Sequence, residues 1–285
     1  MRPVGFHVSI AGGLASAVER GVERECTCLQ IFCGNPRAWA ITERTAEEVA
    51  EFRNARYEAE LSPVAVHACY LINPCSPSER VVERSLKRLI WELETTARIG
   101  AEFYVIHPGS GKDESDEWAR QRAIASLSEA WRAADSAPCI LLENTAGQHG
   151  PGQSFGQMAD VIEAVQESAP GSEMGIAVDT CHAFAAGYDL REPSEVERLV
   201  GEIDETVGLE RLRLLHTNDA RDAAGSHRDR HWHIGEGEIG DEGFAHLLHH
   251  EALQAIPAIC ETPWESVDTD RKNISRLRHI MSSSP

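Results

Sequence analysis

Eight short apolar runs recur along the chain, and this recurrence limits the folds that the chain can adopt. The segments between them have apolar residues at helical spacing, as at Val82, Leu86, Leu89 and Leu93. Runs that are apolar on both faces are typical of parallel strands covered by helices. The alternation predicts an α/β protein with a (β/α)8 or TIM barrel. The expected strands lie near residues 4–8, 28–33, 63–69, 103–107, 139–143, 175–179, 212–216 and 256–261.

Capping signals indicate several helix boundaries. Ser or Thr followed three positions later by Glu or Gln favours a helix start, and glycine favours a helix end. The predicted starts are Thr45, Ser154 and Ser194, and the predicted ends are Gly100 and Gly208. We expect one barrel domain over residues 1–285, in which residues 281–285 form a frayed tail.

Composition excludes several classes of protein. No apolar run reaches the roughly 18 to 20 residues of a membrane span, and the N-terminus MRPVGFHVS lacks the pattern of a signal peptide. We therefore expect a soluble, cytoplasmic protein. The eight cysteines form no CxxC pair, which favours reduced thiols packed as small hydrophobes over a disulfide framework.

Side chains that can bind a divalent metal stand at or just after the ends of successive apolar runs, or in the loop that follows one of them. Because the carboxyl ends of barrel strands meet at one mouth, we expect these residues to converge there. An isolated histidine among them would more often be an ordinary core or surface residue, so the recurrence carries the prediction. The candidate ligands are His67, His107, Glu143, Asp179, His182, His216, Asp229, His231 and Glu261.

Nine candidate ligands are more than one ion needs, because a catalytic zinc takes about three protein ligands. The set therefore indicates two or three ions, and histidine with carboxylate favours zinc or manganese. Paired divalent ions are the usual apparatus for hydrolysing phosphate esters. The net charge of −19 argues against indiscriminate nucleic-acid binding, but the ions would make a local positive site for a phosphate.

Longer motifs make the chain resemble the endonuclease IV family, the zinc-dependent abasic-site endonucleases of DNA repair. The resemblance covers nearly the whole chain in order. Its segments are GFHVSIAGGL, NPRAW, HACYLIN, IHPGS, LLENTAGQ, GIAVDTCHAFAAGYDL, LLHTND, DRHWHIGEGEIG and ICETP.

The resemblance implies a (β/α)8 barrel that holds three zinc ions, with manganese able to substitute. It implies three ligand groups, of which the first two share the catalytic Glu143: His67, His107 and Glu143; Glu143, Asp179, His216 and Glu261; and His182, Asp229 and His231. It further implies hydroxide attack on the phosphorus 5′ to an abasic sugar, which leaves a 3′-hydroxyl and a 5′-deoxyribose phosphate. Removal of blocked 3′ ends is a further expected activity.

Double-stranded DNA with abasic sites is the partner that the resemblance implies, and we expect a monomer. Arg37, Tyr70 and Leu71 match the loops with which the family enters the DNA stack. The loops also depart from the family pattern, because Pro36, Ala38, Pro74 and Cys75 stand where other residues are expected. These departures concern DNA affinity and leave the ligands intact.

Two alternatives remain open. A metal-dependent sugar isomerase or epimerase of the xylose-isomerase-like barrels uses a set like Glu143, Asp179, His216 and Glu261. It would leave the other five candidate ligands without a role and predicts one or two ions, so metal counting separates the two. A non-catalytic, metal-stabilised binding protein is the other alternative, although closed structural zinc sites usually use cysteine.

Overall fold

Eight parallel strands close into a barrel in the computed structural model, which describes residues 2–283. The barrel order is β1, β10, β7, β6, β5, β4, β3, β2, so β1 pairs with both β2 and β10. This confirms the predicted fold and all eight predicted strands. Their bounds are β1 Val4–Val8, β2 Cys28–Ile31, β3 Val64–His67, β4 Phe103–Ile106, β5 Cys139–Glu143, β6 Met174–Asp179, β7 Leu212–His216 and β10 Ala258–Cys260.

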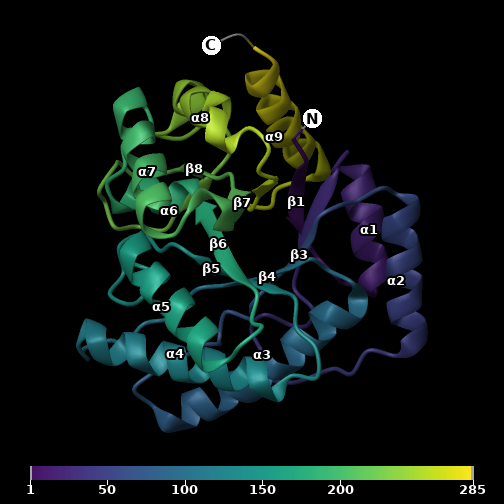
Figure 1. Cartoon of the computed structure of the whole chain (residues 1–285). Coiled ribbons are helices and arrows are strands. Elements are labelled where there is room, and N and C mark those ends of the chain that lie inside the picture. The colour runs from purple at the N-terminus through teal and green to yellow at the C-terminus, as the bar shows by residue number, and fades with distance from the viewer. Residues whose placement is uncertain (1, 284–285) are drawn as a thin grey trace.

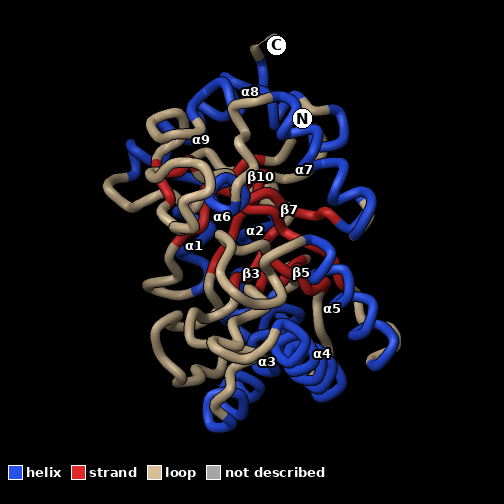
Figure 2. The backbone as a smooth tube through the Cα atoms, turned by 90° about the vertical axis from the view of Figure 1, so that its left-hand side faces the viewer, coloured by secondary structure: helices blue, strands red, loops and turns tan. Residues whose placement is uncertain are grey.

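Helices surround the barrel, while the strands occupy its centre (Figures 1 and 2). Inside the barrel, one buried apolar residue from each of seven strands forms a single cluster that includes Val105, Leu141 and Leu214. The helices are α1 Leu14–Glu23, α2 Ala46–Glu58, α3 Glu79–Ile99, α4 Asp116–Ala133, α5 Phe155–Ser168, α6 Thr180–Ala186, α7 Pro193–Thr206, α8 Gly240–His249 and α9 Val267–Ser282, with short 3-10 turns η1 Leu209–Arg211 and η2 Glu251–Leu253.

The predicted helix boundaries agree with the structure except at Ser194. Thr45 makes a reciprocal capping box with Glu48, and Gly100 ends α3 in the left-handed conformation. Helix α7 instead begins at Pro193, because proline is preorganised for the first helical position and needs no donor there. Ser194 therefore lies inside the first turn and is not the cap.

The C-terminal tail is more ordered than the sequence predicts. Helix α9 continues to Ser282, so residues 281 and 282 are helical, whereas residues 284 and 285 lie outside the described part. All eight cysteines fall within the described residues and are free thiols. Among residues 2–283, the helices lack the combination of length and apolar character that crossing a membrane requires.

Candidate metal centre

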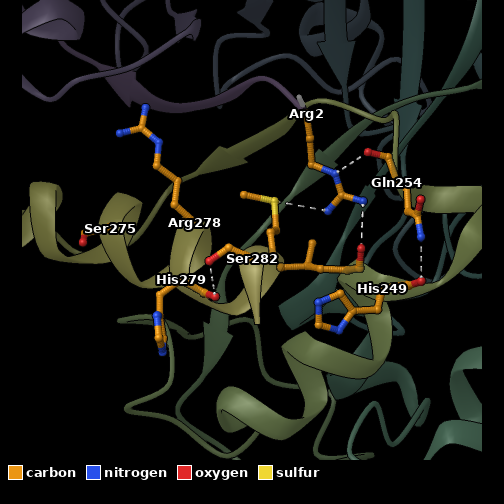
Figure 3. A pocket seen from close by; sticks show the side chains of 9 residues that line it. Arg2, His249, Gln254, Ser275, Arg278, His279 and Ser282 are labelled. Atoms are coloured by element: carbon orange, nitrogen blue, oxygen red, sulfur yellow. Dashed lines mark hydrogen bonds between the residues drawn. The ribbon is translucent and has the colours of Figure 1, made fainter. Parts of the chain in front are cut away.

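A cavity beside the start of β1 is lined by residues of α8 and α9, and the arginine in it already has hydrogen-bond partners within the protein. Arg2 precedes β1, and its guanidinium donates to the backbone oxygens of Leu248 and Gln254 (Figure 3). It also donates to the backbone oxygen of Leu253. Met281 of α9 completes the surroundings of this arginine. Because the carbonyls occupy its donors, Arg2 joins α8, η2 and α9 to the barrel and offers little to a ligand.

The carboxyl ends of the strands carry the candidate ligands. His67, Glu143, Asp179 and His216 are the last residues of β3, β5, β6 and β7. His107 directly follows β4, and Glu261 directly follows β10. The parallel direction of the strands brings all six to the same mouth, as the sequence predicts.

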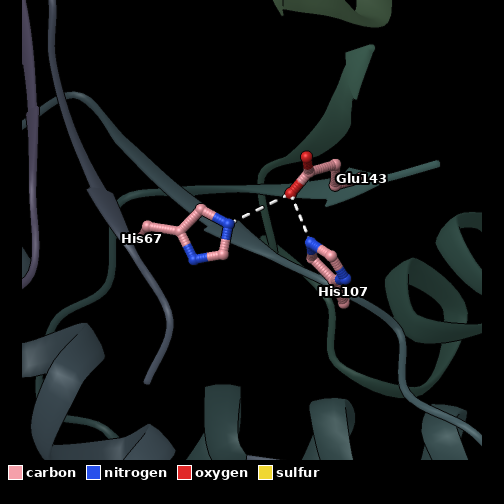
Figure 4. A group of neighbouring side chains, drawn as sticks. All are labelled: His67, His107 and Glu143. Atoms are coloured by element: carbon pink, nitrogen blue, oxygen red, sulfur yellow. Dashed lines mark hydrogen bonds and ion pairs between the residues drawn. The ribbon is translucent and has the colours of Figure 1, made fainter. Parts of the chain in front are cut away.

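His67, His107 and Glu143 form the first group (Figure 4). The Nε2 atom of His67 lies 3.1 Å from Oε2 of Glu143, and the Nε2 atom of His107 lies 2.9 Å from the same oxygen. Glu143 is completely buried, while His107 is partly exposed on the open side. Two ring nitrogens and one carboxylate oxygen therefore point at a common position.

Glu143 also belongs to the second group, with Asp179, His216 and Glu261. The Nδ1 atom of His216 lies 2.8 Å from Oε1 of Glu143 and 3.3 Å from Oε2 of Glu261. Glu143 thus turns one oxygen toward the first group and the other toward the second. This is the geometry that a carboxylate needs to bridge two ions.

The third group consists of His182 from α6, Asp229 from a loop and His231 from the short strand β9 (His231–Trp232). The Nε2 atoms of His182 and His231 each lie 3.2 Å from Oδ1 of Asp229. Strand β9 pairs with β8 (Asp219–Ala220), so a two-stranded ribbon after β7 presents two of these residues. The candidate ligand atoms of each group lie within 4.8 Å of one another.

The four carboxylates give this cluster a negative charge that cations would balance. Among residues 2–283, every ion pair of its four carboxylates involves a histidine, and none involves lysine or arginine. Burial alone would raise the pKa of Glu143, but the charges of His107 and His216 outweigh burial and hold that pKa well below its usual range. Burial lowers the pKa of His216, yet Glu261 and Glu143 outweigh this and raise it to about 9. The carboxylates therefore draw protons onto the histidines, as they would draw metal ions.

Hydrogen bonds to the far side of the rings orient three of the histidines. The Nδ1 atoms of His67, His182 and His231 donate to the backbone oxygens of Ala68, Asn144 and Glu261, at 3.0, 2.9 and 3.2 Å. When an ion replaces the proton and the ring is neutral, each Nε2 atom is thereby left with its lone pair for the metal. Such a partner fixes the tautomer that a metal ligand requires, so the donor set fits divalent ions.

A further potential ligand, Cys181, lies within reach of Asp179 and His231. Burial raises the pKa of its thiol far above the usual range, with a further increase from the charge of Asp179. Because the thiolate is the form that binds metal, a thiol held protonated is a poor competitor for the ion. Cys181 is therefore best described as a packed thiol, like the other cysteines.

Sequence reasoning missed two side chains that reach the centre, His7 and Gln30. Gln30 is completely buried; its Oε1 accepts from Nε2 of His216 at 2.9 Å, and its Nε2 donates to Glu261 at 2.6 Å. His7 Nδ1 lies 3.1 Å from Oε1 of Glu261. One polar residue inside the apolar run CLQIF was the signal that could have identified Gln30.

The predicted DNA-contact residues lie beside the ligands but differ in exposure. Tyr70 is 65 % exposed and lines a cavity of about 450 Å³ that also contains His107, Glu143 and Asp229. Arg37 is exposed on the same side, whereas Leu71 is half-buried against the main core. His233, a histidine outside the candidate ligand set, is buried, although the polar sequence around it favours a surface position.

His233 is held inside by two polar neighbours. Its Nδ1 lies 3.2 Å from the amide of Asn273 in α9, and its Nε2 lies 3.3 Å from Glu265. The polar sequence around position 233 does not indicate that α9 packs over His233. The surface position that the local sequence favours for His233 is therefore wrong.

Comparisons with known proteins agree with the fold and with the motifs. The family model of the xylose isomerase-like TIM barrel matches residues 18–281. A protein named probable endonuclease 4 from Methanoculleus marisnigri is 40 % identical over 279 residues, which cover 97 % of this chain and 98 % of the relative. Its namesake from Halothermothrix orenii is 38 % identical, over 96 % of this chain and 99 % of the relative.

Solved structures of two kinds of enzyme have a similar backbone fold. The crystal structure of endonuclease IV from Thermus thermophilus has a TM-score of 0.87 and 34 % identity, and the match covers 98 % of each chain. A 3-keto-D-glucoside 4-epimerase from E. coli has a TM-score of 0.68 at 16 % identity, over 98 % of this chain and 100 % of that one. At this low identity, the epimerase is evidence for a shared fold alone.

Proposed function

Because the chain belongs to the endonuclease IV family, we propose that it is a zinc-dependent DNA-repair endonuclease that cleaves the phosphodiester bond 5′ to abasic sites. Its partner is double-stranded DNA, on which it acts as a monomer in the cytoplasm. The observation that carries the proposal is the three-part ligand cluster at one barrel mouth, with Glu143 common to two parts. A single-ion site would leave most of this cluster without a role.

Three zinc ions, with manganese able to substitute, are the cofactors that we propose for the cluster. When bound, such ions stabilise negative charge on a phosphate and lower the pKa of water. The proposed holders are His67, His107 and Glu143 for one ion; Glu143, Asp179, His216 and Glu261 for the second; and His182, Asp229 and His231 for the third.

The chain's own residues prepare this chemistry. The depressed pKa of Glu143 keeps its carboxylate ionised, so it serves as an anchor and does not act as a proton donor. Histidines with one nitrogen tied to a backbone oxygen cannot turn away when substrate enters. The cavity of about 450 Å³ has room for a phosphodiester together with its sugar.

The proposed reaction adds one water across the bond between the phosphorus and the 3′ oxygen of the preceding nucleotide. It leaves a 3′-hydroxyl and a 5′-deoxyribose phosphate. A blocked 3′ end offers the same kind of bond, so the same site also supports 3′-end cleaning. Arg37 and Tyr70 line a cleft beside the candidate ligands, and we propose that they enter the opened helix together with the half-buried Leu71. An abasic site is the least costly place to open the helix.

A metal-dependent sugar isomerase or epimerase is the second candidate, because Glu143, Asp179, His216 and Glu261 form one four-residue group. That reaction needs one or two ions and gives no role to the group of His182, Asp229 and His231. The two functions therefore differ in the number of ions per active protein. They also differ in substrate, since only the nuclease acts on a phosphodiester.

A strand-specific nicking assay tests the proposal. The zinc-loaded protein is incubated with a labelled duplex that carries one abasic site, with and without a chelator, and metal content is measured on the same sample. We expect about three ions per chain, one nick directly 5′ to the lesion and a 3′ end that a polymerase extends. Equal cutting of an undamaged duplex, or full activity with a single ion, would contradict the proposal.

A further inference from the structure

A second cleft, of about 630 Å³, adjoins the cavity of the metal centre. We call it the Trp264 cleft, and its lining includes Arg24, Phe32, Arg37, Tyr70 and Trp264. Phe32 and Tyr70 line both spaces, and their rings meet edge to face with centroids 5.1 Å apart. The two spaces are therefore neighbours on either side of one aromatic pair, so a ligand long enough to pass these rings would contact both.

Trp264 is an exposed aromatic side chain whose ring packs against Arg24 on one face. Its side chain is 65 % exposed, although large apolar side chains are usually covered. The guanidinium of Arg24 lies 5.1 Å from the centre of the indole, within cation–π range. One face of the ring is thus held by the protein, which leaves the other available to a flat partner.

The support beneath Trp264 is itself rigid. Arg24 is only 4 % exposed, and its Nε donates to Oδ2 of Asp270 at 2.7 Å. Its Nη1 donates to the backbone oxygen of Arg20 at 3.0 Å. These bonds fix Arg24, and its contact with the indole in turn holds Trp264. Trp264 would therefore lose little side-chain entropy when a ligand binds to it.

The charge around the cleft suits an anion that carries a flat ring. Arg20, Arg24 and Arg37 line it, and Asp270, which also lines it, is paired with Arg24. In a chain with a net charge of −19, this local excess of arginine is unusual. Among the described residues, four large apolar side chains are exposed, and two of them, Tyr70 and Trp264, line this cleft.

We propose that the Trp264 cleft is a nucleotide subsite, in which a base next to the cleaved phosphodiester leaves the helical stack and stacks on Trp264. The phosphate of this nucleotide is held at the rim by Arg37. Base stacking on an aromatic side chain tolerates any base, which suits an enzyme that meets lesions in every sequence. The inference rests on the proposed function, since it requires that a DNA phosphodiester binds at the metal centre while a neighbouring nucleotide binds in the Trp264 cleft.

Variants of Trp264 test the subsite in the zinc-loaded protein. The probe is a duplex with one tetrahydrofuran abasic analogue, and the half-saturating protein concentration is measured in single-turnover cleavage. Trp264→Ala should raise that concentration roughly tenfold to a few hundredfold, and Trp264→Phe should restore most of the loss. Zinc content and hydrolysis of bis(p-nitrophenyl) phosphate should stay unchanged, because neither needs the platform.

Tyr57→Ala is the matched control. Tyr57 is 84 % exposed but lies at the C-terminal end of α2, which leads into the amino end of β3, away from the ligand mouth. This variant should cleave the probe like the parent. A second measurement uses 2-aminopurine placed beside the abasic analogue, whose fluorescence should be quenched by the parent and by Trp264→Phe but not by Trp264→Ala.

The outcomes separate this inference from the proposed function. If the parent nicks abasic DNA and Trp264→Ala matches it in both half-saturation and 2-aminopurine quenching, the subsite is overturned while the nuclease remains. A loss in Tyr57→Ala as large as in Trp264→Ala would also overturn the subsite. If the parent cleaves no abasic duplex at all, the proposed function fails, and the subsite fails with it.

Discussion

Glu143 presents each of its two carboxylate oxygens to a different set of histidines. Glu143→Gln should lower the rate of abasic-site cleavage by several orders of magnitude, because a neutral amide weakens the bridge between two ligand groups. Single-turnover cleavage by a folded, zinc-loaded variant provides the measurement. A near-normal rate would mean that Glu143 is only a buried structural carboxylate.

Gln30 is the residue that holds His216 and Glu261 in place from the outside of the cluster. Gln30→Leu should lower zinc affinity by about 10-fold to 100-fold, the usual effect of losing a partner that orients a ligand. Competition with a chromophoric chelator measures the affinity. Gln121→Leu serves as the control, because among residues 2–283 the side chain of Gln121 bonds only to Glu117, on the exposed face of α4. Equal affinities in both variants would leave Gln30 without an orienting role.

The cysteines should resist alkylation in the folded protein. Burial raises the pKa of Cys26 and of Cys75 to about 12, and that of Cys139 to about 11. Since the thiolate is the reactive form and its fraction rises with pH, iodoacetamide at pH 8 should label Cys139 first, as the one cysteine that is not fully buried. Mass spectrometry of native and unfolded samples checks this order, and rapid labelling of Cys26 in the native protein would contradict it.

At the scale of elements, the loop from β7 to α8 depends on Asp219. Its buried carboxylate accepts the amide hydrogens of Ala220, Gly237 and Ile239, at 2.8, 3.1 and 2.9 Å, and so ties the two ends of the loop together. Asp219→Ala should loosen this loop, which carries Asp229 and His231, and reduce the metal content from about three ions to about two.

Elemental analysis of the Asp219→Ala protein provides the measurement. Asp241→Asn is the control, because it removes an acidic group nearby whose pair with Arg276 is exposed and contributes little. Retention of all three ions by Asp219→Ala would show that the loop keeps its shape without this carboxylate.

The elements that the sequence predicted best are those with a repeated physical signal. Continuous apolar runs identified the strands, because a strand buried on both faces leaves a pattern that few other structures share. Ser194 shows the limit of a capping-box pattern, because the neighbouring Pro193 favours the first helical position and the helix begins there. The positions of His233 and Gln30 depend on contacts between segments that are distant in sequence. The spacing of residues along the chain does not predict such contacts.

At the scale of the whole molecule, the ligand cluster connects parts of the barrel that are far apart in sequence. Its members end or follow six of the eight barrel strands, so bound ions would link those strands at one rim. An ion present at a hundredfold its Kd stabilises a fold by about 2.7 kcal/mol. Chelation should therefore lower the Tm by roughly 5 °C or more.

Calorimetry with and without chelator measures this shift. Zinc added back should restore the original Tm, while magnesium should not, because histidine-rich sites favour zinc over harder cations. An unchanged Tm after complete removal of metal would show that the cluster is stable without ions.

The convergence of the candidate ligands was predictable from the sequence, but the shape of the surface around the Trp264 cleft was not. Parallel strands bring their last residues together whatever the loops do, which placed His67, Glu143 and Asp179 correctly. The Trp264 cleft is instead made by loops after different strands, and its platform depends on Arg24 reaching Trp264 from another part of the chain. Loop shape of this kind follows from tertiary contacts and has no periodic pattern.

The pairing of β1 with β10 gives the molecule a built-in order of assembly. A ribosome delivers Glu261 after all the other candidate ligands, immediately behind the strand that closes the barrel. A nascent chain that stops short of this point has neither a closed barrel nor its full ligand set. The candidate metal centre therefore cannot be complete during most of translation, and it can form only when the last barrel strand has been added.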